Sequence, residues 1–276
     1  MKNETSHIKN RAFQLGARTT AEGSFFISSP SNNLVKYAAS LKEKKYRNIH
    51  CEFLAEGTRL VMDLIKYDFD SVVHVFITNE YIEDASIIGL LGDKIKLVSD
   101  SVMRKLSDTD TSQNIVAIVK KKQEITLDML ISKNKNILFL DRVSDPNNLG
   151  TIVRTAAAAN YALILNNCTD IYANKVVRGS MGAVLKSDFI EGDISAISIL
   201  KQHKYTFLSS CLNGKNVFTM QKIHPVCIAI GSEAHGLDKE IISLSDEIIS
   251  IPMVDNSESL NVSVATGVLA YHFFGG

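Results

Sequence analysis

The chain has 276 residues, of which 45% are hydrophobic and 22% are charged, and its formal net charge at pH 7 is +0. This composition excludes a disordered chain, and the length allows one or two domains with a sizeable core. Met1 to Gly23 contain no apolar signal region and no apolar run reaches membrane-spanning length, so we expect a cytoplasmic protein.

The four cysteines are scattered along the chain at apolar positions. None forms a C-x-x-C pair or stands at zinc spacing with a histidine, so we expect no metal site. Scattered cysteines of this kind fit a reducing compartment and structural burial.

The charge is unevenly distributed. Residues 1–50 contain nine Lys or Arg and three Glu, so their net charge is 9 − 3 = +6. A basic end on a neutral protein indicates contact with a polyanion, and Lys44, Lys45 and Arg47 are the candidates for it. A solvated helix face would give the same pattern.

The first half of the chain predicts a compact β/α unit over residues 31–120. Residues 1–30, which mix Gly, Ser, Thr and charge, predict a flexible basic arm before it. Hydrophobic periodicity predicts helices over 31–46, 58–67 and 101–106, and strands over 53–57, 72–78, 95–98 and 115–119. Residues 121–136 are the predicted linker.

The second half, residues 137–276, alternates strands with helices. The predicted strands are 137–140, 162–165, 205–208, 226–230 and 248–253, and the predicted helices are 151–160, 173–185, 194–203, 238–244 and a last one capped by Ser259. This alternation predicts an α/β fold with a mostly parallel sheet covered on both faces. In such sheets, ligands bind at the carboxyl ends of the strands.

Three loops follow predicted strand ends in this half. In the first, Gly150 and Arg154 are four residues apart on one helical face, and Arg154 could hold a phosphate or stabilise an alkoxide. An ordinary ion pair of this arginine is the alternative. The second loop, Gly231 to Gly236, is neither a Walker loop nor a dinucleotide fingerprint.

The third loop follows the strand that Pro252 must end. It leads to a helix start that is rich in polar residues, including Ser259, Asn261 and Ser263. These are more polar groups than a helix start needs, although an ordinary capped helix is the alternative. Leu260, Val264 and Val268 are predicted to share one face of that helix.

Together, the three loops resemble the three motifs of the SpoU (TrmH) family of RNA ribose 2′-O-methyltransferases. The matching segments are Asn148-x-Gly150-x-x-x-Arg154, Gly231-Ser232-Glu233-x-x-Gly236, Ile251-Pro252-Met253 and Ser259-Leu260-Asn261-Val262-Ser263-Val264-Ala265. The first unit resembles the family's substrate-binding domain, a small ribosomal-protein-like RNA-binding fold, more loosely. That match is carried by residues 29–32, 53–57 and 107–111.

The resemblance implies a SPOUT-type catalytic domain whose C-terminal chain threads a deep trefoil knot. S-adenosylmethionine would bind in the knotted loops, largely through backbone. The implied cofactor-binding residues are Gly231, Ile251, Pro252, Met253 and Leu260. The resemblance also implies a homodimer through the C-terminal domain. The residues that we expect to contact RNA are Lys44, Lys45, Arg47 and Arg154.

The implied catalytic residues are Asn148, Arg154, Glu233, Ser259 and Asn261. Family precedent gives Arg154 the role of the base, but a guanidinium with a pKa above about 12 stays charged. We therefore expect Arg154 to stabilise the forming alkoxide and the adjacent phosphate. Asn148, Ser259 and Asn261 would orient the ribose and Arg154, and Glu233 would fix the loop or Arg154 and have a close donor.

Among RNA substrates the extra N-terminal domain favours large-subunit (23S) rRNA. A tRNA 2′-O-methyltransferase and an RNA-binding protein with an inactive cofactor site are the alternatives. A nicotinamide-dependent oxidoreductase would fit the strand–helix alternation, but the chain lacks the glycine fingerprint of that class.

Overall fold

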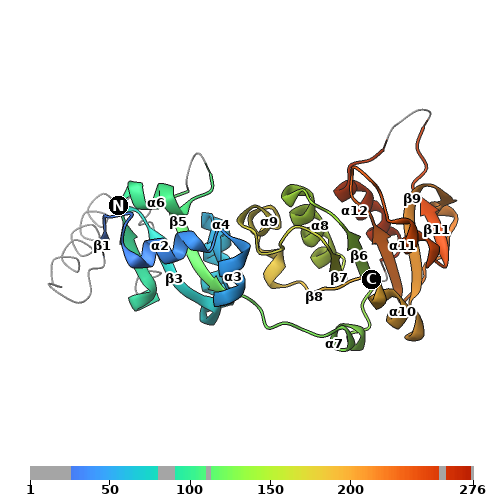
Figure 1. Ribbon diagram of the computed structural model, residues 1–276, viewed down its shortest axis with the longest axis horizontal. Helices are drawn as coiled ribbons and strands as arrows, with labels where there is room; N and C mark the ends of the chain where they lie inside the picture. Colours follow the sequence, from blue (N-terminus) through green and yellow to red (C-terminus); the bar gives the residue numbers. More distant parts are fainter. Residues whose placement is uncertain (1–25, 80–90, 110–112, 255–258, 275–276) are drawn as a thin grey trace, which may run out of the picture. The chain divides into compact units, whose positions relative to one another are not determined.

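The computed structural model describes residues 26–79, 91–109, 113–254 and 259–274 (Figure 1). The chain divides into two compact units, residues 1–121 and 122–276. The predicted arm lies outside the described residues up to residue 25, and its end contributes a short strand at Phe26–Ile27. Among the described helices, none has the length and apolar character needed to cross a membrane.

The N-terminal unit is built on a mixed sheet with the strand order β1-β4-β3-β5-β2. Its strands are β1 (Phe26–Ile27), β2 (Glu52–Glu56), β3 (Val72–Ile77), β4 (Ile95–Val98) and β5 (Ile115–Lys120). Strand β5 runs antiparallel to β2 and β3, and the other pairs are parallel. The helices are α2 (Asn33–Ser40), α3 (Lys44–His50), α4 (Thr58–Tyr67) and α6 (Asp100–Leu106), with 3₁₀ turns η1 (Phe69–Ser71) and η3 (Gly92–Lys94).

The helix predicted over 31–46 is broken into α2 and α3. Helix α2 ends at its cap residue Leu41, and α3 begins at Lys44. Arg47, which is 4% exposed, donates to the carbonyls of Leu41 (2.9 Å) and Lys42 (2.7 Å). These carbonyls lie at the break, so the guanidinium supplies donors that a continuous helix would have supplied from its own backbone.

The C-terminal unit contains an all-parallel sheet with the strand order β11-β9-β10-β6-β7-β8. Its strands are β6 (Ile137–Asp141), β7 (Ala162–Asn166), β8 (Phe189–Glu191), β9 (Thr206–Asn216), β10 (Val226–Ile230) and β11 (Glu247–Ser250). Its helices are α7 (Leu127–Ser132), α8 (Pro146–Ala158), α9 (Asn174–Gly179), α10 (Ser195–Gln202), α11 (Lys239–Ser243) and α12 (Val262–His272), with 3₁₀ turns η4 (Ala183–Leu185) and η5 (Val217–Thr219).

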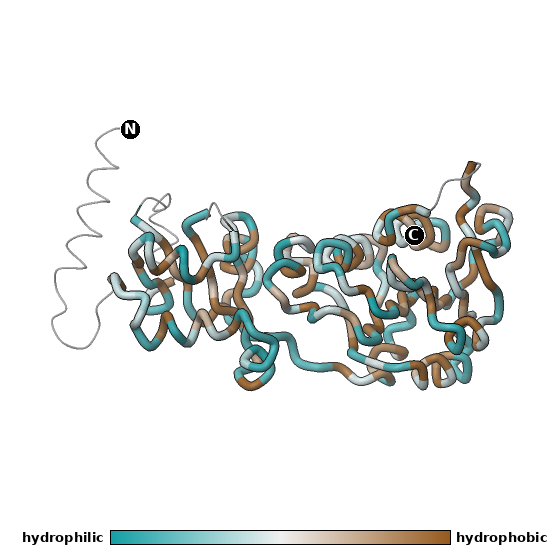
Figure 2. Tube along the Cα trace, turned by 45° about the horizontal axis from the view of Figure 1, so that its top comes forward, coloured by the Kyte–Doolittle hydropathy of each residue, from teal (hydrophilic) through white to brown (hydrophobic). Residues whose placement is uncertain are grey.

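Helices cover both faces of this parallel sheet (Figure 1). On one face α7, α10 and α11 bury Leu130, Leu200 and Ile241 against Phe139 and Phe207 of the sheet. On the other, α8 packs against both α9 and α12. Figure 2 shows hydrophobic segments within this unit, and β6 and β10 are buried along their whole length, as expected for a sheet buried on both faces.

Three further differences from the sequence prediction concern α7, α9 and β8. The predicted linker 121–136 includes α7, whose Leu130 belongs to the C-terminal core, so part of that segment is structural. The predicted helix over 173–185 is interrupted because Met181 (φ 52°) and Gly182 (φ 78°) take left-handed backbone conformations. Strand β8, three residues at the sheet edge, was not predicted, since so short a run gives little pattern.

Candidate active site

The first predicted loop becomes helix earlier than expected. Helix α8 starts at Pro146, five residues before the predicted start at residue 151, because Asp145 caps it by accepting a hydrogen bond from the Asn147 N–H (3.1 Å). An Asp–Pro pair at a helix start is a signal that the periodicity alone misses. Asn148 therefore lies in the first turn of α8, next to the carboxyl end of β6.

A three-residue network joins the three motif loops. The Asn148 side-chain amide donates to Glu233 in the loop after β10, and its oxygen accepts from Asn261 Nδ2 (3.0 Å). Both polar groups of the Asn148 amide are thus used. Glu233 has the close donor that the sequence predicted, although this carboxylate is exposed rather than buried.

Asn261, not Ser259, caps helix α12. Its Oδ1 accepts from the backbone N–H groups of Ser263 (2.9 Å) and Val264 (3.3 Å). Helix α12 therefore starts at Val262, and Leu260 lies before it. Leu260 is 40% and Val264 is 53% exposed, so the helix face predicted from these residues is not the buried one.

Two glycines allow close approach of backbone around this site. A Cβ on Gly150 would lie 3.0 Å from the Val176 carbonyl oxygen, so this position lets α8 and α9 pack closely. A Cβ on Gly231 would lie 2.2 Å from the Gly236 carbonyl carbon. Glycine is thus the residue type that the turn after β10 requires at position 231.

Arg154 lies outside the network in this single chain. Its side chain is exposed on the same face of α8 as Asn147 and Thr151. Within the described part of the chain it takes part in no hydrogen bond or ion pair. Arg154 lies at the surface of α8 and forms no hydrogen bond or ion pair with Glu233 or Asn261. The ion pair that the sequence left as an alternative is not formed among the described residues.

The predicted cofactor-binding residues flank two strand ends. Gly231 directly follows β10, and Ile251, Pro252 and Met253 directly follow β11. Ile251 and Met253 are partly buried. Ser259 is exposed, and residues 255–258 of the third loop lie outside the described residues.

The predicted polyanion contacts of α3 separate into two kinds. Lys44 and Lys45 are exposed on the helix. Arg47 is buried with its guanidinium bonded to backbone carbonyls at the end of α2. Because such a guanidinium is not accessible to a ligand, the prediction of an RNA contact by Arg47 is corrected to a structural role.

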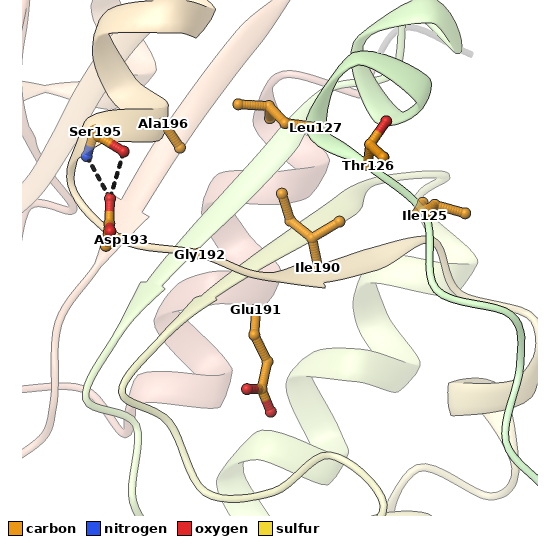
Figure 3. Close-up of a pocket in the computed structure, with 9 residues that line it drawn as sticks. All are labelled: Ile125, Thr126, Leu127, Ile190, Glu191, Gly192, Asp193, Ser195 and Ala196. Atoms are coloured by element: carbon orange, nitrogen blue, oxygen red, sulfur yellow. Dashed lines mark hydrogen bonds between the residues drawn. The ribbon is translucent and has the colours of Figure 1, made fainter. Parts of the chain in front are cut away.

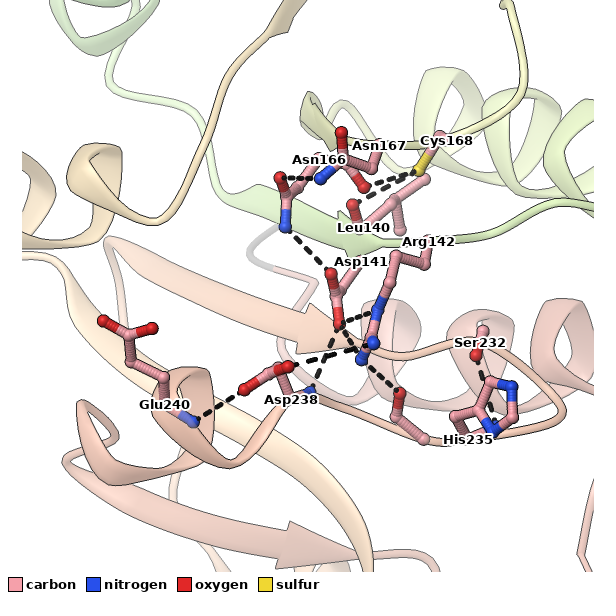
Figure 4. Close-up of polar contacts among 11 residues, drawn as sticks. Leu140, Asp141, Arg142, Asn166, Asn167, Cys168, Ser232, His235, Asp238 and Glu240 are labelled. Atoms are coloured by element: carbon pink, nitrogen blue, oxygen red, sulfur yellow. Dashed lines mark hydrogen bonds and ion pairs between the residues drawn. The ribbon is translucent and has the colours of Figure 1, made fainter.

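A second polar cluster, around Asp141 and Arg142, was not predicted (Figure 4). The Asp141 carboxylate, 1% exposed at the end of β6, accepts from Asn166 Nδ2 (2.8 Å), from Arg142 Nη2 (2.9 Å) and from the Asp238 N–H (3.3 Å). The sequence signal was an acidic residue directly after a buried apolar strand. A buried carboxylate needs such donors, so this cluster fixes the end of β6.

The thiol in this cluster is not a nucleophile. Burial raises the pKa of Cys168 to about 11, so the group stays protonated and donates to the Leu140 carbonyl (3.3 Å). Burial also raises the pKa of Cys227, whereas Cys51 is exposed. Among the described residues no three His, Cys, Asp or Glu side chains are grouped as metal ligands.

An open pocket of about 280 Å³ lies elsewhere, beside the edge strand β8 (Figure 3). It is lined by Ile125, Thr126, Leu127, Ile190, Glu191, Gly192, Asp193, Ser195 and Ala196. None of the predicted site residues is among them. The charged residues of this lining, Glu191 and Asp193, are both acidic, which suits a nucleic acid poorly.

Comparison with known proteins agrees with the motif loops. The SpoU rRNA methylase family matches residues 135–271, and the MRM3-like substrate binding domain matches residues 32–117. The 23S rRNA (guanosine(2553)-2′-O)-methyltransferase RlmP of Bacillus subtilis is 28% identical over 253 residues, which are 90% of this chain and 99% of that protein.

Two further relatives agree. The 23S rRNA (guanosine-2′-O-)-methyltransferase RlmB of Acinetobacter baylyi is 31% identical over 193 residues, which are 65% of this chain and 77% of RlmB. The crystal structure of an AdoMet-bound rRNA methyltransferase from Sinorhizobium meliloti has 26% sequence identity and a TM-score of 0.77, covering 90% of this chain and 96% of that one.

The all-parallel sheet, the motif loops and these matches define an RNA methyltransferase with a separate substrate-binding domain. The chain belongs to the SpoU rRNA methylase family, which confirms the resemblance drawn from the sequence.

The Glu233–Asn148–Asn261 network can be tested by moving the carboxylate from residue 233 to residue 148. Asn148→Asp places a second carboxylate against Glu233, and we expect methyl transfer to fall by about tenfold or more because a like-charge contact replaces a hydrogen bond. Adding Glu233→Gln restores a donor–acceptor pair in the reverse sense, so the double variant should recover most of the rate. Rates measured for the four proteins of this cycle test the coupling, and equal losses in the single and double variants would contradict it.

Proposed function

We propose that this protein transfers a methyl group from S-adenosylmethionine to the ribose 2′-hydroxyl of a guanosine in 23S rRNA. The observation that carries the proposal is the Glu233–Asn148–Asn261 network, which joins the three motif loops of the family in one site. The names of the relatives supply the substrate class. An rRNA substrate also agrees with the cytoplasmic location predicted from the sequence.

The residues around the strand ends fit the cofactor. Ile251 and Met253 are only partly buried and Leu260 is 40% exposed, so apolar surface remains that a flat adenine base could cover. The turn after Gly231 would place backbone atoms close to a ligand bound at Gly231. Bound there, S-adenosylmethionine would supply a methyl group already activated by a positive sulfur.

The protein's own task is then to orient the ribose and to stabilise the negative charge that develops on its oxygen. Arg154 would face the developing alkoxide and the neighbouring phosphate, where a guanidinium offers a fixed pair of donors. Asn148, Asn261 and Ser259 would hold the ribose through hydrogen bonds. Holding the reacting atoms in line supplies several kcal/mol of the rate enhancement by itself. The proton leaves to water or phosphate, since Arg154 stays charged.

The N-terminal unit would bind the RNA. Lys44 and Lys45 are exposed on α3 of the mixed-sheet domain that matches a substrate-binding domain. Each cation placed against a phosphate contributes to affinity in a salt-dependent way.

The proposal includes the trefoil knot that the family resemblance implies. Within this proposal, contacts at the end of α12 fasten the C-terminal helix beside the starts of β6 and β7. The Asn136 side-chain amide donates to the Phe273 carbonyl (3.1 Å), and the Tyr161 hydroxyl donates to the Ala270 carbonyl (3.0 Å).

We also propose a homodimer through the C-terminal domain, and helix α12 supports it. This helix buries Leu269 and Ala270 within the chain, yet Val264 and Tyr271 are 53% and 52% exposed. A helix that is apolar around its circumference is normally covered on all sides, so a second copy would cover the outer face. Such a dimer could bring Arg154 of one subunit towards the network of the other.

A charge on the outer face of α12 should therefore prevent dimerisation. Val264→Glu would place two charges in a two-fold interface, and we expect the dimer Kd to rise by about 100-fold or more. Ile199→Glu, at an apolar residue of α10 that is 36% exposed, is the matched control and should leave the dimer intact. Sedimentation equilibrium measures both, and a monomeric parent protein would contradict the dimer.

Mapping of ribose methylation tests the function directly. RNA from a strain that lacks the gene should lose one 2′-O-methylguanosine in 23S rRNA, and expression of the intact protein should restore it. Loss of a tRNA ribose methylation would favour the tRNA alternative. Calorimetry with S-adenosylmethionine separates an active enzyme from an RNA-binding protein whose cofactor site is inactive.

A further inference from the structure

Arg142 occupies a backbone conformation that arginine rarely adopts. It follows the last residue of β6 with φ 57°, in the left-handed region that favours glycine. Its backbone N–H donates to the Asn166 carbonyl (2.8 Å), so the strained turn sits between the ends of β6 and β7. Backbone strain of this kind persists where the surrounding structure holds the residue in place.

The side chain reaches from β6 to the loop after β10 (Figure 4). Arg142 donates through Nε (3.1 Å) and Nη2 (2.9 Å) to one oxygen of the buried Asp141 carboxylate. The same guanidinium lies 3.5 Å from the Gly236 carbonyl oxygen and 3.8 Å from an Asp238 carboxylate oxygen. Asp141 itself accepts from the Asp238 N–H (3.3 Å). Asp141 and Arg142 therefore hold residues 236–238, the far limb of that loop, through its backbone and through the Asp238 side chain.

A displacement of residues 236–238, the far limb of the loop, would be transmitted to Gly231. The turn is closed by the Gly236 N–H, which donates to the Ser232 carbonyl (2.9 Å). The two limbs are so close that a Cβ on Gly231 would lie 2.3 Å from the Leu237 nitrogen. A shift of residues 236–238 towards Gly231 would therefore push on its backbone, and a shift away from it would break the hydrogen bond between Gly236 and Ser232.

We propose that Asp141 and Arg142 form a positioning pair that sets the affinity for S-adenosylmethionine by fixing the turn over residues 231–238. The proposal rests on the proposed function, because it takes Gly231 as a cofactor contact. Neither residue touches the reacting atoms, so the pair should act on cofactor binding and leave the chemical step nearly unchanged.

The test compares two glycine variants of the full-length protein. In each, the replaced residue has a left-handed backbone conformation. Arg142→Gly removes the side chain and relieves the backbone. Lys204→Gly does the same at φ 65° in an exposed turn before β9 and is the matched control. Asp238→Asn is a third variant, which keeps a capping side chain at the start of α11 but removes the charge facing Arg142.

We expect Arg142→Gly to raise the calorimetric Kd and the KM for S-adenosylmethionine by roughly three- to tenfold, because the charge-assisted hydrogen bonds from Arg142 to the Asp141 carboxylate are lost. The kcat at saturating cofactor and the KM for RNA should stay within about twofold of the parent values. Asp238→Asn should shift the same two constants in the same direction by less. Lys204→Gly should match the parent in all four.

The outcomes separate this proposal from the proposed function. Unchanged cofactor affinity in Arg142→Gly overturns the positioning role. A fall in kcat and in the thermal midpoint without a change in cofactor affinity overturns it as well, because that pattern indicates a merely structural residue. Failure of the parent protein to bind S-adenosylmethionine overturns the proposed function and this proposal with it.

Discussion

Replacement of Arg154 by alanine is expected to lower kcat by about 100- to 1,000-fold, the usual cost of removing one donor that stabilises a developing negative charge. The fold should not suffer. Arg154 is exposed on α8 and, among the described residues, has no hydrogen bond or ion pair to lose. Alanine is also the better helix former. Single-turnover methyl transfer at saturating cofactor and RNA measures the effect.

Two companion variants show what kind of group is needed. Arg154→Lys keeps the charge but not the planar fork, and we expect it to remain at least about tenfold slower than the parent enzyme. Thr151→Ala changes the same exposed face one turn earlier and should leave the rate unchanged. Near-full turnover by Arg154→Lys would exclude a need for the fork, and near-full turnover by Arg154→Ala would remove the arginine from the mechanism.

Replacement of Gly231 by alanine is expected to weaken S-adenosylmethionine binding by about 100-fold, because forcing an extra carbon into a closely packed site costs about 1–3 kcal/mol and each 1.4 kcal/mol is about tenfold in Kd. The added Cβ would lie 2.2 Å from the Gly236 carbonyl carbon and 2.3 Å from the Leu237 nitrogen. Both neighbours are backbone atoms and have no rotamer by which to move away. Calorimetric titration with the cofactor measures the loss.

Gly236→Ala is the matched control for that variant. Gly236 has φ 64°, so alanine there is strained by about 1 kcal/mol, but nothing lies within 4 Å of the added Cβ. We expect a loss of about tenfold or less. Equal losses in the two variants would show that backbone strain, not the close approach at Gly231, governs this turn.

Segments with strong local patterns were predicted well. Helix α4 has the predicted bounds, Thr58–Tyr67, because four apolar residues recur at helical spacing on one face. Strand β10 also has its predicted bounds, Val226–Ile230, since an uninterrupted apolar run is typical of a strand buried on both faces. The family was indicated by the resemblance of three motifs in their residues, order and spacing.

Contacts made across long separations were not predictable in the same way. The pairings of Asn148 with Glu233 and with Asn261 join residues 85 and 113 positions apart. The break between α2 and α3 depends on a buried Arg47, which by residue type alone would be placed at the surface. The Asp141–Arg142 pair depends on a loop nearly a hundred residues further along the chain, and its reach to Asp238 has no local signature.

The sequence by itself determined the two-domain α/β organisation and the family, because periodicity and the order of short motifs are properties of the chain. Only the tertiary structure decided which polar side chains meet, which cations are exposed and which residue caps α12. The physical reason is that the parallel sheet brings together the carboxyl ends of strands that lie far apart in sequence. Each donor or carboxylate there is satisfied by whatever neighbour the fold brings within hydrogen-bonding distance.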